Sequence, residues 1–205
     1  NDVKLDEAIW RNIVKSGRSG FFGKTDIKSE NTKTKILPNF TKRSRAYLEI
    51  QNGCDHSCTF CIIPQGRGLS KSVAMDTILE KINNLVNKGF KEIVLTGVDI
   101  TCWGSDLSGN HKLGDLVIKI LDKTPNLPRL RLSSIDVSEM DDGLLHVFKT
   151  NKRMMPHLHL SLQSGNNLIL KRMKRRHSRE QAIDLCKNLK AARPELTFGA
   201  DLIAG

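Results

Sequence analysis

Short runs in which apolar and polar residues alternate recur along the chain from residue 45 onward. In the run 157–163 (HLHLSLQ), three leucines alternate with His, Ser and Gln side chains. An alternation with a period of two is typical of a β-strand that has one apolar and one polar face. The sequence predicts five strands, over residues 45–51, 91–97, 128–134, 157–163 and 196–205.

Segments with helical periodicity separate these strands. The predicted helices cover 72–89, 113–123, about 141–149, and a last one that begins near Asn166 or Ser178 and runs to about Ala192. Repeated strand–helix–strand order favours a parallel sheet with helical crossovers, which is either a doubly wound sheet or a TIM-type barrel.

The polar faces of the strands separate these two folds. Leu130 and Leu132 lie opposite Arg129, Arg131 and Ser133 in one strand, and 45–51 and 157–163 follow the same rule. Helices cover both faces of a doubly wound sheet, so both faces would be apolar. A polar-lined α/β barrel of the TIM type fits better. The helices between the strands disfavour the alternative, an antiparallel sheet with one wet face. Because only five strands precede Gly205, we expect a partial barrel, incomplete at its C-terminal end.

The chain before residue 45 has a different composition. Residues 5–16 (LDEAIWRNIVKS) have the spacing of a short helix, and 17–44 are rich in Gly, Ser, Thr, Asn and Lys without periodicity. We therefore expect three parts: a helical remnant of a preceding domain over 1–16, a linker over 17–44, and a core domain over 45–205.

Charge and apolar content narrow the possible partners and compartment. The chain carries 33 Lys and Arg against 22 Asp and Glu, a net charge of +11, which favours a polyanionic partner. No apolar run approaches the roughly 20 residues of a membrane span, and no secretion signal is present, so we expect a cytoplasmic protein without membrane contact. The basic segment 171–179 holds six Lys or Arg and is predicted to contact RNA phosphates; the alternative is a solvated helix face.

Three cysteines cluster directly after the first predicted strand, in CDHSCTFC. Cys54, Cys58 and Cys61 are spaced C-x3-C-x2-C at the end of the strand where barrels carry their active sites. His56 could complete a structural zinc site, but its short steps to Cys54 and Cys58 would strain such chelation. A [4Fe–4S] cluster takes one thiolate per iron, so three cysteines leave one iron open. Cys102 and Cys186 are isolated in sequence and predicted to be structural.

These motifs resemble a known family. The triplet after the first strand resembles that of radical S-adenosylmethionine (SAM) enzymes, and GCDHSCTFCIIPQGRG (53–68) is similar to the corresponding segment of their methylthiotransferase family. Further similar segments are 91–101, 130–139, 156–165, 170–183 and 198–205. They look like the branch that acts on N6-threonylcarbamoyladenosine at position 37 of tRNA. The isopentenyladenosine branch would show Gly-Gln-Asn and Ser-Ser-His-Pro where this chain has Gly97-Val98-Asp99 and Ser133-Ser134-Ile135-Asp136.

The resemblance implies cofactors and the residues that bind them. Cys54, Cys58 and Cys61 would hold a [4Fe–4S] cluster whose open iron binds SAM. The residues implied to contact SAM are Gly97, Asp99, Ser133, Gln163 and Arg175.

It also implies a transferase that adds a methylthio group to C2 of the adenosine in the anticodon loop, with an electron donor such as flavodoxin or ferredoxin. Isopentenyladenosine-37 tRNA and a ribosomal protein remain alternative substrates. A non-catalytic, zinc-stabilised nucleic-acid-binding module is the alternative from another class.

Family members carry two further parts. One is an N-terminal domain with a second [4Fe–4S] cluster, and the other is a C-terminal RNA-binding TRAM domain. These 205 residues show neither, so we expect the chain to cleave SAM without completing methylthiolation.

Overall fold

The computed structural model describes residues 44–204, and these contain the predicted core. The helix predicted over 5–16 and nearly all of the linker predicted over 17–44 lie outside the described residues.

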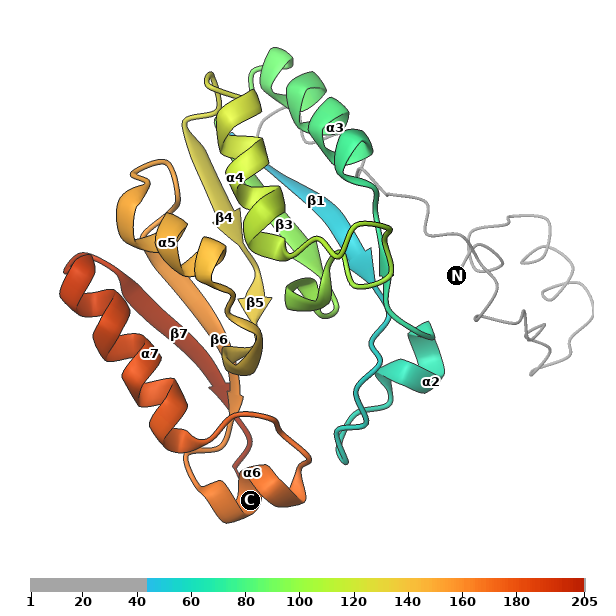
Figure 1. The fold of residues 1–205 in the computed structure, drawn as a ribbon, viewed down its shortest axis with the longest axis vertical. Coiled ribbons are helices and arrows are strands. Elements are labelled where there is room, and N and C mark those ends of the chain that lie inside the picture. The colour runs from blue at the N-terminus through green and yellow to red at the C-terminus, as the bar shows by residue number, and fades with distance from the viewer. Residues whose placement is uncertain (1–43, 205) are drawn as a thin grey trace, which may run out of the picture. The chain divides into compact units, whose positions relative to one another are not determined.

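Two small sheets built from parallel strands form the centre of this core (Figure 1). In the first, β1 (Arg45–Asn52), β3 (Glu92–Gly97) and β4 (Arg129–Leu132) are parallel neighbours, and the short β2 (Lys71–Ser72) pairs antiparallel with β1. The strands follow one another in chain order, as in a barrel. A doubly wound sheet would reverse its order at a switch point.

The second sheet continues this order. It contains β5 (Ser134–Ile135), β6 (His157–Gln163) and β7 (Thr197–Leu202), all parallel. Only Ser133 separates β4 from β5, so the strand predicted over 128–134 passes from one sheet to the other. The result is a curled partial barrel, which confirms the predicted fold class.

Helices cover one face of these strands. Figure 1 shows α3 (Met75–Asn87), α4 (Leu113–Lys123), α5 (Asp142–Thr150) and α7 (Arg179–Ala192) lying along that face. Leucines of alternate strand positions, such as Leu48, Leu130 and Leu158, are buried against them. The alternation in the sequence therefore correctly separates the helix-covered face from the polar face.

The helix boundaries follow local capping chemistry. Both starts proposed for the last helix are used, because Asn166 caps α6 (Asn167–Arg172) and Ser178 caps α7 through a capping box with Gln181. The helix predicted over 72–89 begins only at Met75, since Lys71 and Ser72 pair with β1. The pattern did not predict α2 (Ile63–Arg67) or the 3₁₀ turns η2 (Ile100–Cys102) and η3 (Val137–Glu139).

Ion pairs occupy the polar face at the N-terminal ends of the strands. The Glu92 carboxylate accepts from Nε of Arg45 at 2.9 Å, Arg129 at 3.2 Å and Arg131 at 2.7 Å. Burial raises the pKa of Glu92, but the hydrogen bond and charge of Arg131 and the charge of Arg45 outweigh it, so the pKa lies below its ordinary value. One buried carboxylate thus joins β1, β3 and β4 at the N-terminal ends of these strands.

We predict that Glu92→Gln lowers the free energy of unfolding by about 2–3 kcal/mol. Loss of one partner of a buried ion pair costs roughly 3–5 kcal/mol, and the partial exposure of the three guanidinium groups reduces that cost. Urea unfolding followed by circular dichroism measures it. Glu195→Gln is the matched control, because its ion pair with Arg193 uses an exposed carboxylate. An equal loss of stability in the two variants would contradict the role of Glu92 in joining the three strands.

Candidate metal centre

The three clustered cysteines lie in a loop at the C-terminal end of β1. Cys54 N donates to Gly68 O at 3.1 Å, which closes the loop on itself. Gly53, at φ 77°, makes this crossing possible, because a Cβ there would lie 2.0 Å from Leu69 O. This backbone hydrogen bond therefore closes residues 54–68 into one loop, which contains the cysteine segment 54–61.

The same loop contacts the turn that follows α6. Thr59 N and its hydroxyl donate to Met173 O at 3.3 Å and Arg172 O at 3.2 Å. Arg175 Nη1 lies 3.7 Å from Cys58 Sγ. The cysteine loop is thus held between the end of β1 and the turn after α6, which are more than 100 residues apart in sequence.

The donor set fits an iron–sulfur cluster. Cys54, Cys58 and Cys61 are unpaired in disulfides and half-buried. Burial raises the pKa of Cys54 to about 12 against the hydrogen bond from His56 N, and the Asp99 carboxylate adds to the rise. Three thiols in one loop, with a guanidinium beside one sulfur, match the ligation and hydrogen bonding of such clusters. Nε2 of His56 contacts Asp99, Glu139 and Cys102 instead, which disfavours a Cys3His zinc site.

Gln51, the penultimate residue of β1, connects the cysteine loop to β3. Its side chain is fully buried, and its Oε1 accepts from Val98 N at 3.1 Å and Asp99 N at 2.8 Å. Its Nε2 donates to Gly53 O at 2.7 Å and Ser70 Oγ at 2.9 Å. One amide therefore fixes both the start of the cysteine loop and the turn after β3.

Gly97 and Asp99 lie in that turn, as predicted. A Cβ at Gly97 would lie 2.6 Å from Ile100 Cγ2 and 2.8 Å from Gln51 O, so only glycine fits. Asp99 Oδ2 accepts from Cys54 Sγ at 3.5 Å, which places its carboxylate beside the cysteine loop. The structure therefore brings Asp99 to the cysteine loop, while Gly97 ends β3 against Gln51.

Ser133 and Gln163 occupy the other strand ends. The Ser133 hydroxyl is buried without a hydrogen-bond partner among the described residues. Gln163, the last residue of β6, has φ 66° and accepts from Ile203 N at 2.9 Å through its backbone oxygen. Their contact with a cofactor stays a prediction.

Arg175 is held in a buried ionic network. Its Nη2 donates to Asp136 Oδ2 at 2.9 Å and Ser161 O at 2.7 Å, while its Nε is buried without a partner among the described residues. Burial raises the pKa of Asp136, but contacts from His177, Ser138 and Arg175 outweigh it and hold the pKa well below its usual range. Asp136 is thus ionised and fixes Arg175 beside Cys58.

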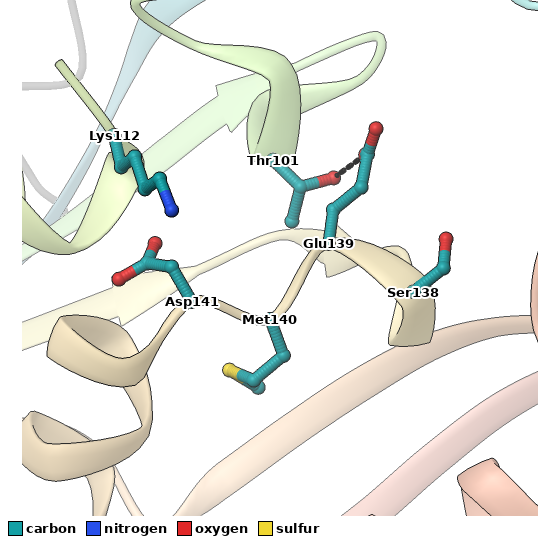
Figure 2. Close-up of a pocket in the computed structure, with 6 residues that line it drawn as sticks. All are labelled: Thr101, Lys112, Ser138, Glu139, Met140 and Asp141. Atoms are coloured by element: carbon teal, nitrogen blue, oxygen red, sulfur yellow. Dashed lines mark hydrogen bonds between the residues drawn. The ribbon is translucent and has the colours of Figure 1, made fainter. Parts of the chain in front are cut away.

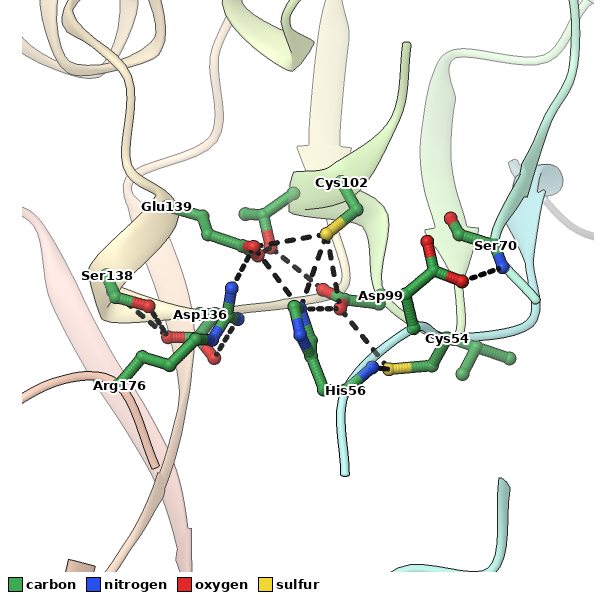
Figure 3. A network of polar contacts seen from close by, with 12 residues as sticks. Cys54, His56, Ser70, Asp99, Cys102, Asp136, Ser138, Glu139 and Arg176 are labelled. Carbon is green, nitrogen blue, oxygen red and sulfur yellow. Dashed lines mark hydrogen bonds and ion pairs between the residues drawn. The ribbon is translucent and has the colours of Figure 1, made fainter. Parts of the chain in front are cut away.

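Cys102, which is isolated in sequence, has three polar neighbours in the fold. Its Sγ lies 3.4 Å from His56 Nε2, 3.4 Å from Asp99 Oδ2 and 3.1 Å from Glu139 Oε1 (Figure 3). Burial and the neighbouring Glu139 and Asp99 carboxylates raise the pKa of this thiol far above its ordinary value. Chain folding brings η2, which follows β3, against β5 and η3 at this end, which sequence spacing could not show. Cys186, in contrast, packs partly buried against the core, as predicted.

A cavity of about 280 Å³ opens beside this group. Figure 2 shows its lining: Thr101, Lys112, Ser138, Glu139, Met140 and Asp141. Thr101 Oγ1 donates to Glu139 Oε2 at 2.7 Å across one wall. The cavity therefore lies at the C-terminal ends of the strands, where barrels bind ligands.

Residues of this centre that were absent from the predicted site include Gln51, Asp136 and Glu139. Gln51 could have been found from its polar-face position at the end of a strand. Asp136 and Glu139 lie within the segment 130–139. Nothing in their spacing indicates that Asp136 contacts Arg175 or that Glu139 contacts His56.

A sequence comparison decides the family. The sequence model of the radical SAM superfamily matches residues 48–205. The chain belongs to the radical SAM superfamily.

Curated relatives of this radical SAM chain are tRNA-modifying enzymes. It is 51% identical over 181 residues to the threonylcarbamoyladenosine tRNA methylthiotransferase MtaB of Rickettsia prowazekii, covering 88% of this chain and 43% of the relative. Identity to MtaB of Bacillus subtilis is 38%, covering 82% of this chain and 37% of the relative. Identity to tRNA-2-methylthio-N(6)-dimethylallyladenosine synthase of Shouchella clausii is 35%, covering 92% of this chain and 37% of the relative. The chain thus spans about two fifths of these relatives.

Solved radical SAM structures share the fold. The cobalamin- and [4Fe–4S]-bound methyltransferase TsrM of Kitasatospora setae matches with a TM-score of 0.61 at 16% identity, covering 78% of this chain and 31% of that one. Apo OxsB, a cobalamin-dependent radical SAM enzyme, matches with a TM-score of 0.57 at 18% identity, covering 77% and 23%. At these identities the likeness concerns the fold alone.

No helix in residues 44–204 combines the length and apolar character that crossing a bilayer requires.

We predict that Gln51→Leu lowers the free energy of unfolding by at least about 3 kcal/mol, because each buried group left without a partner costs roughly 1–3 kcal/mol. Iron uptake by the cysteine loop should fall with it. Urea unfolding and iron content after anaerobic reconstitution measure the two effects. Gln65→Leu makes the same change at an exposed position and should alter stability by less than about 0.5 kcal/mol. Unchanged stability of Gln51→Leu would rule out the connecting role.

Proposed function

We propose that this chain is the radical-generating part of a tRNA methylthiotransferase that modifies C2 of N6-threonylcarbamoyladenosine at position 37. The observation that carries the proposal is the loop of three half-buried thiols at the C-terminal end of β1, with Arg175 at 3.7 Å from Cys58. The 51% identity to the Rickettsia MtaB enzyme supports the substrate.

The cofactors follow from the site and the family. Cys54, Cys58 and Cys61 would hold three irons of a [4Fe–4S] cluster and leave the fourth open to SAM. When bound, this pair supplies a 5′-deoxyadenosyl radical, which suits the strong and unreactive adenine C2–H bond. A second cluster and an electron donor such as flavodoxin or ferredoxin remain predictions about the longer protein.

The protein's own residues position these groups. Gln51 fixes the cysteine loop against the turn after β3, and Asp136 holds Arg175 beside Cys58. Ser133 Oγ and Arg175 Nε are buried polar atoms without a partner in the described residues, which supports a ligand close to them. We assign both to SAM binding, together with Gly97, Asp99 and Gln163 at neighbouring strand ends.

The basic segment supports a tRNA substrate only in part. Arg175 and Arg176 form ion pairs with Asp136, and Arg176 also donates to Glu139, so both are engaged within the protein. Lys171, Arg172 and Lys174 remain exposed at the end of α6 and in the turn after it. These three are the residues that we propose contact RNA phosphates.

Anaerobic reconstitution with iron and sulfide tests the enzyme. We expect the chain to bind iron through the three cysteines and, once reduced, to release 5′-deoxyadenosine from SAM. Cys58→Ala should lose both properties, whereas the matched Cys186→Ala should keep them because Cys186 lies in α7. Stoichiometric zinc without iron uptake or SAM cleavage would favour the zinc-stabilised binding module.

The substrate is tested in cells with and without the encoding gene. Mass spectrometry of tRNA nucleosides should show loss of the 2-methylthio form of threonylcarbamoyladenosine alone. Loss of the methylthio form of isopentenyladenosine, or of a modified ribosomal protein, would refute this substrate assignment.

Replacement of Lys171, Arg172 and Lys174 by Gln should weaken binding of an anticodon stem-loop. Each lost phosphate contact reduces the magnitude of the slope of log K against log salt by roughly 0.7–0.9, so the triple change should reduce it by up to about 2.7. Filter binding across salt concentrations measures the slope. The control is Lys119→Gln with Lys123→Gln, on the exposed side of α4. Equal slopes for the two variants would argue against phosphate contacts by Lys171, Arg172 and Lys174.

A further inference from the structure

We propose that His56, Asp99, Cys102 and Glu139 form a second metal site, which binds one divalent cation of the zinc class beside the cysteine loop. These are one imidazole, one thiol and two carboxylates, and their ligand atoms all lie within 4.8 Å of one another (Figure 3). The site shares no ligand with the cysteine triplet. Asp99 belongs both to this site and to the residues assigned to SAM, and the cobalt test below uses no SAM, so the inference is tested apart from the proposed function.

The separations match a four-coordinate ion. With zinc–nitrogen and zinc–oxygen bonds of about 2.0 Å and a zinc–sulfur bond of about 2.3 Å, tetrahedral ligands lie ~3.3 Å apart, or ~3.5 Å where one is sulfur. His56 Nε2 lies 3.0 Å from Asp99 Oδ2 and 3.3 Å from Glu139 Oε1. Cys102 Sγ lies 3.4 Å from His56 Nε2, 3.4 Å from Asp99 Oδ2 and 3.1 Å from Glu139 Oε1. Five of the six edges are thus close to the required lengths.

The Thr101 hydroxyl lies between the two carboxylates and donates to one of them at a time, because it has a single proton. Its hydroxyl lies 3.0 Å from Asp99 Oδ1 and 2.7 Å from Glu139 Oε2. The oxygens that Thr101 contacts are the ones that face away from Cys102 and His56. Outer hydrogen bonds that direct one oxygen of each carboxylate inward are the usual support of protein metal sites.

The donor set selects the class of metal. Magnesium and calcium take oxygen ligands, whereas a thiol and an imidazole favour zinc and related transition metals. Arg176 Nη1 also donates to Glu139 Oε1, so a bound cation shares this oxygen with Arg176 or displaces it.

The site joins three chain segments at the mouth of the barrel. His56 belongs to the cysteine loop between Cys54 and Cys58, Asp99 and Cys102 follow β3, and Glu139 ends η3 after β5. A cation bound there would fix the cysteine loop to both sheets. We infer that its role is to order this loop.

Cobalt titration of a Cys54→Ser, Cys58→Ser, Cys61→Ser variant isolates the site, because only Cys102 and Cys186 then remain as thiols. We expect one equivalent of Co²⁺ to bind with a thiolate-to-cobalt absorption band. Cys102→Ser should abolish the band, and Glu139→Gln should weaken binding. Cys186→Ser is the matched control and should leave both unchanged.

Thr101→Val tests the orienting hydroxyl at almost constant shape. The band should persist while the dissociation constant for Co²⁺ rises by roughly 10–100-fold, as for other outer-shell changes. Circular dichroism of each variant verifies folding. In the cluster-loaded chain, one zinc beyond the iron should be lost in Cys102→Ser with iron content unchanged.

A cobalt complex without a thiolate band, or a band that survives Cys102→Ser, would overturn the proposal. So would the absence of Co²⁺ uptake by a folded triple-serine variant. Because that variant lacks the cluster ligands, its result is independent of SAM cleavage by the unsubstituted chain, and either hypothesis can fail alone.

Discussion

The buried amide of Gln51 is the interaction on which the rest of the centre depends. A side-chain amide can accept and donate at once, and Gln51 uses both ends, on the Val98 and Asp99 amides and on Gly53 and Ser70. No apolar residue could hold two backbone turns together at zero exposure without leaving polar groups unsatisfied. The cysteine loop, the turn after β3 and the polar group around Asp99 are all positioned from this side chain.

Two buried carboxylates organise the remaining polar face. Glu92 gathers three arginines where the strands begin, and Asp136 gathers Arg175 and Arg176 where they end. Without these two carboxylates the neighbouring arginines would repel one another, because burial strengthens charge interactions. The polar lumen is therefore partly structural at one end and available for ligand chemistry at the other.

The contact between the cysteine loop and the turn after α6 links segments that follow strands of the two sheets. Thr59 bonds to the backbone of Arg172 and Met173, and Arg175 reaches Cys58 from the same turn. Exposed Lys171 and Lys174 lie in the same segment. If RNA binds these lysines, its contact is only a few residues from the group that adjoins a cluster ligand, which would bring substrate and radical source to one mouth of the barrel.

The sequence by itself determined the strands, the covering helices and the cysteine loop. Alternation such as that of HLHLSLQ and caps such as Ser178 are local effects, and the three cysteines are close in sequence. The tertiary structure alone decided which residues contact Arg175 and Gln51. It also decided that His56, Cys102 and Glu139 lie next to one another. Those contacts join residues tens of positions apart through the curl of two sheets, and periodicity carries no information about which strand ends meet.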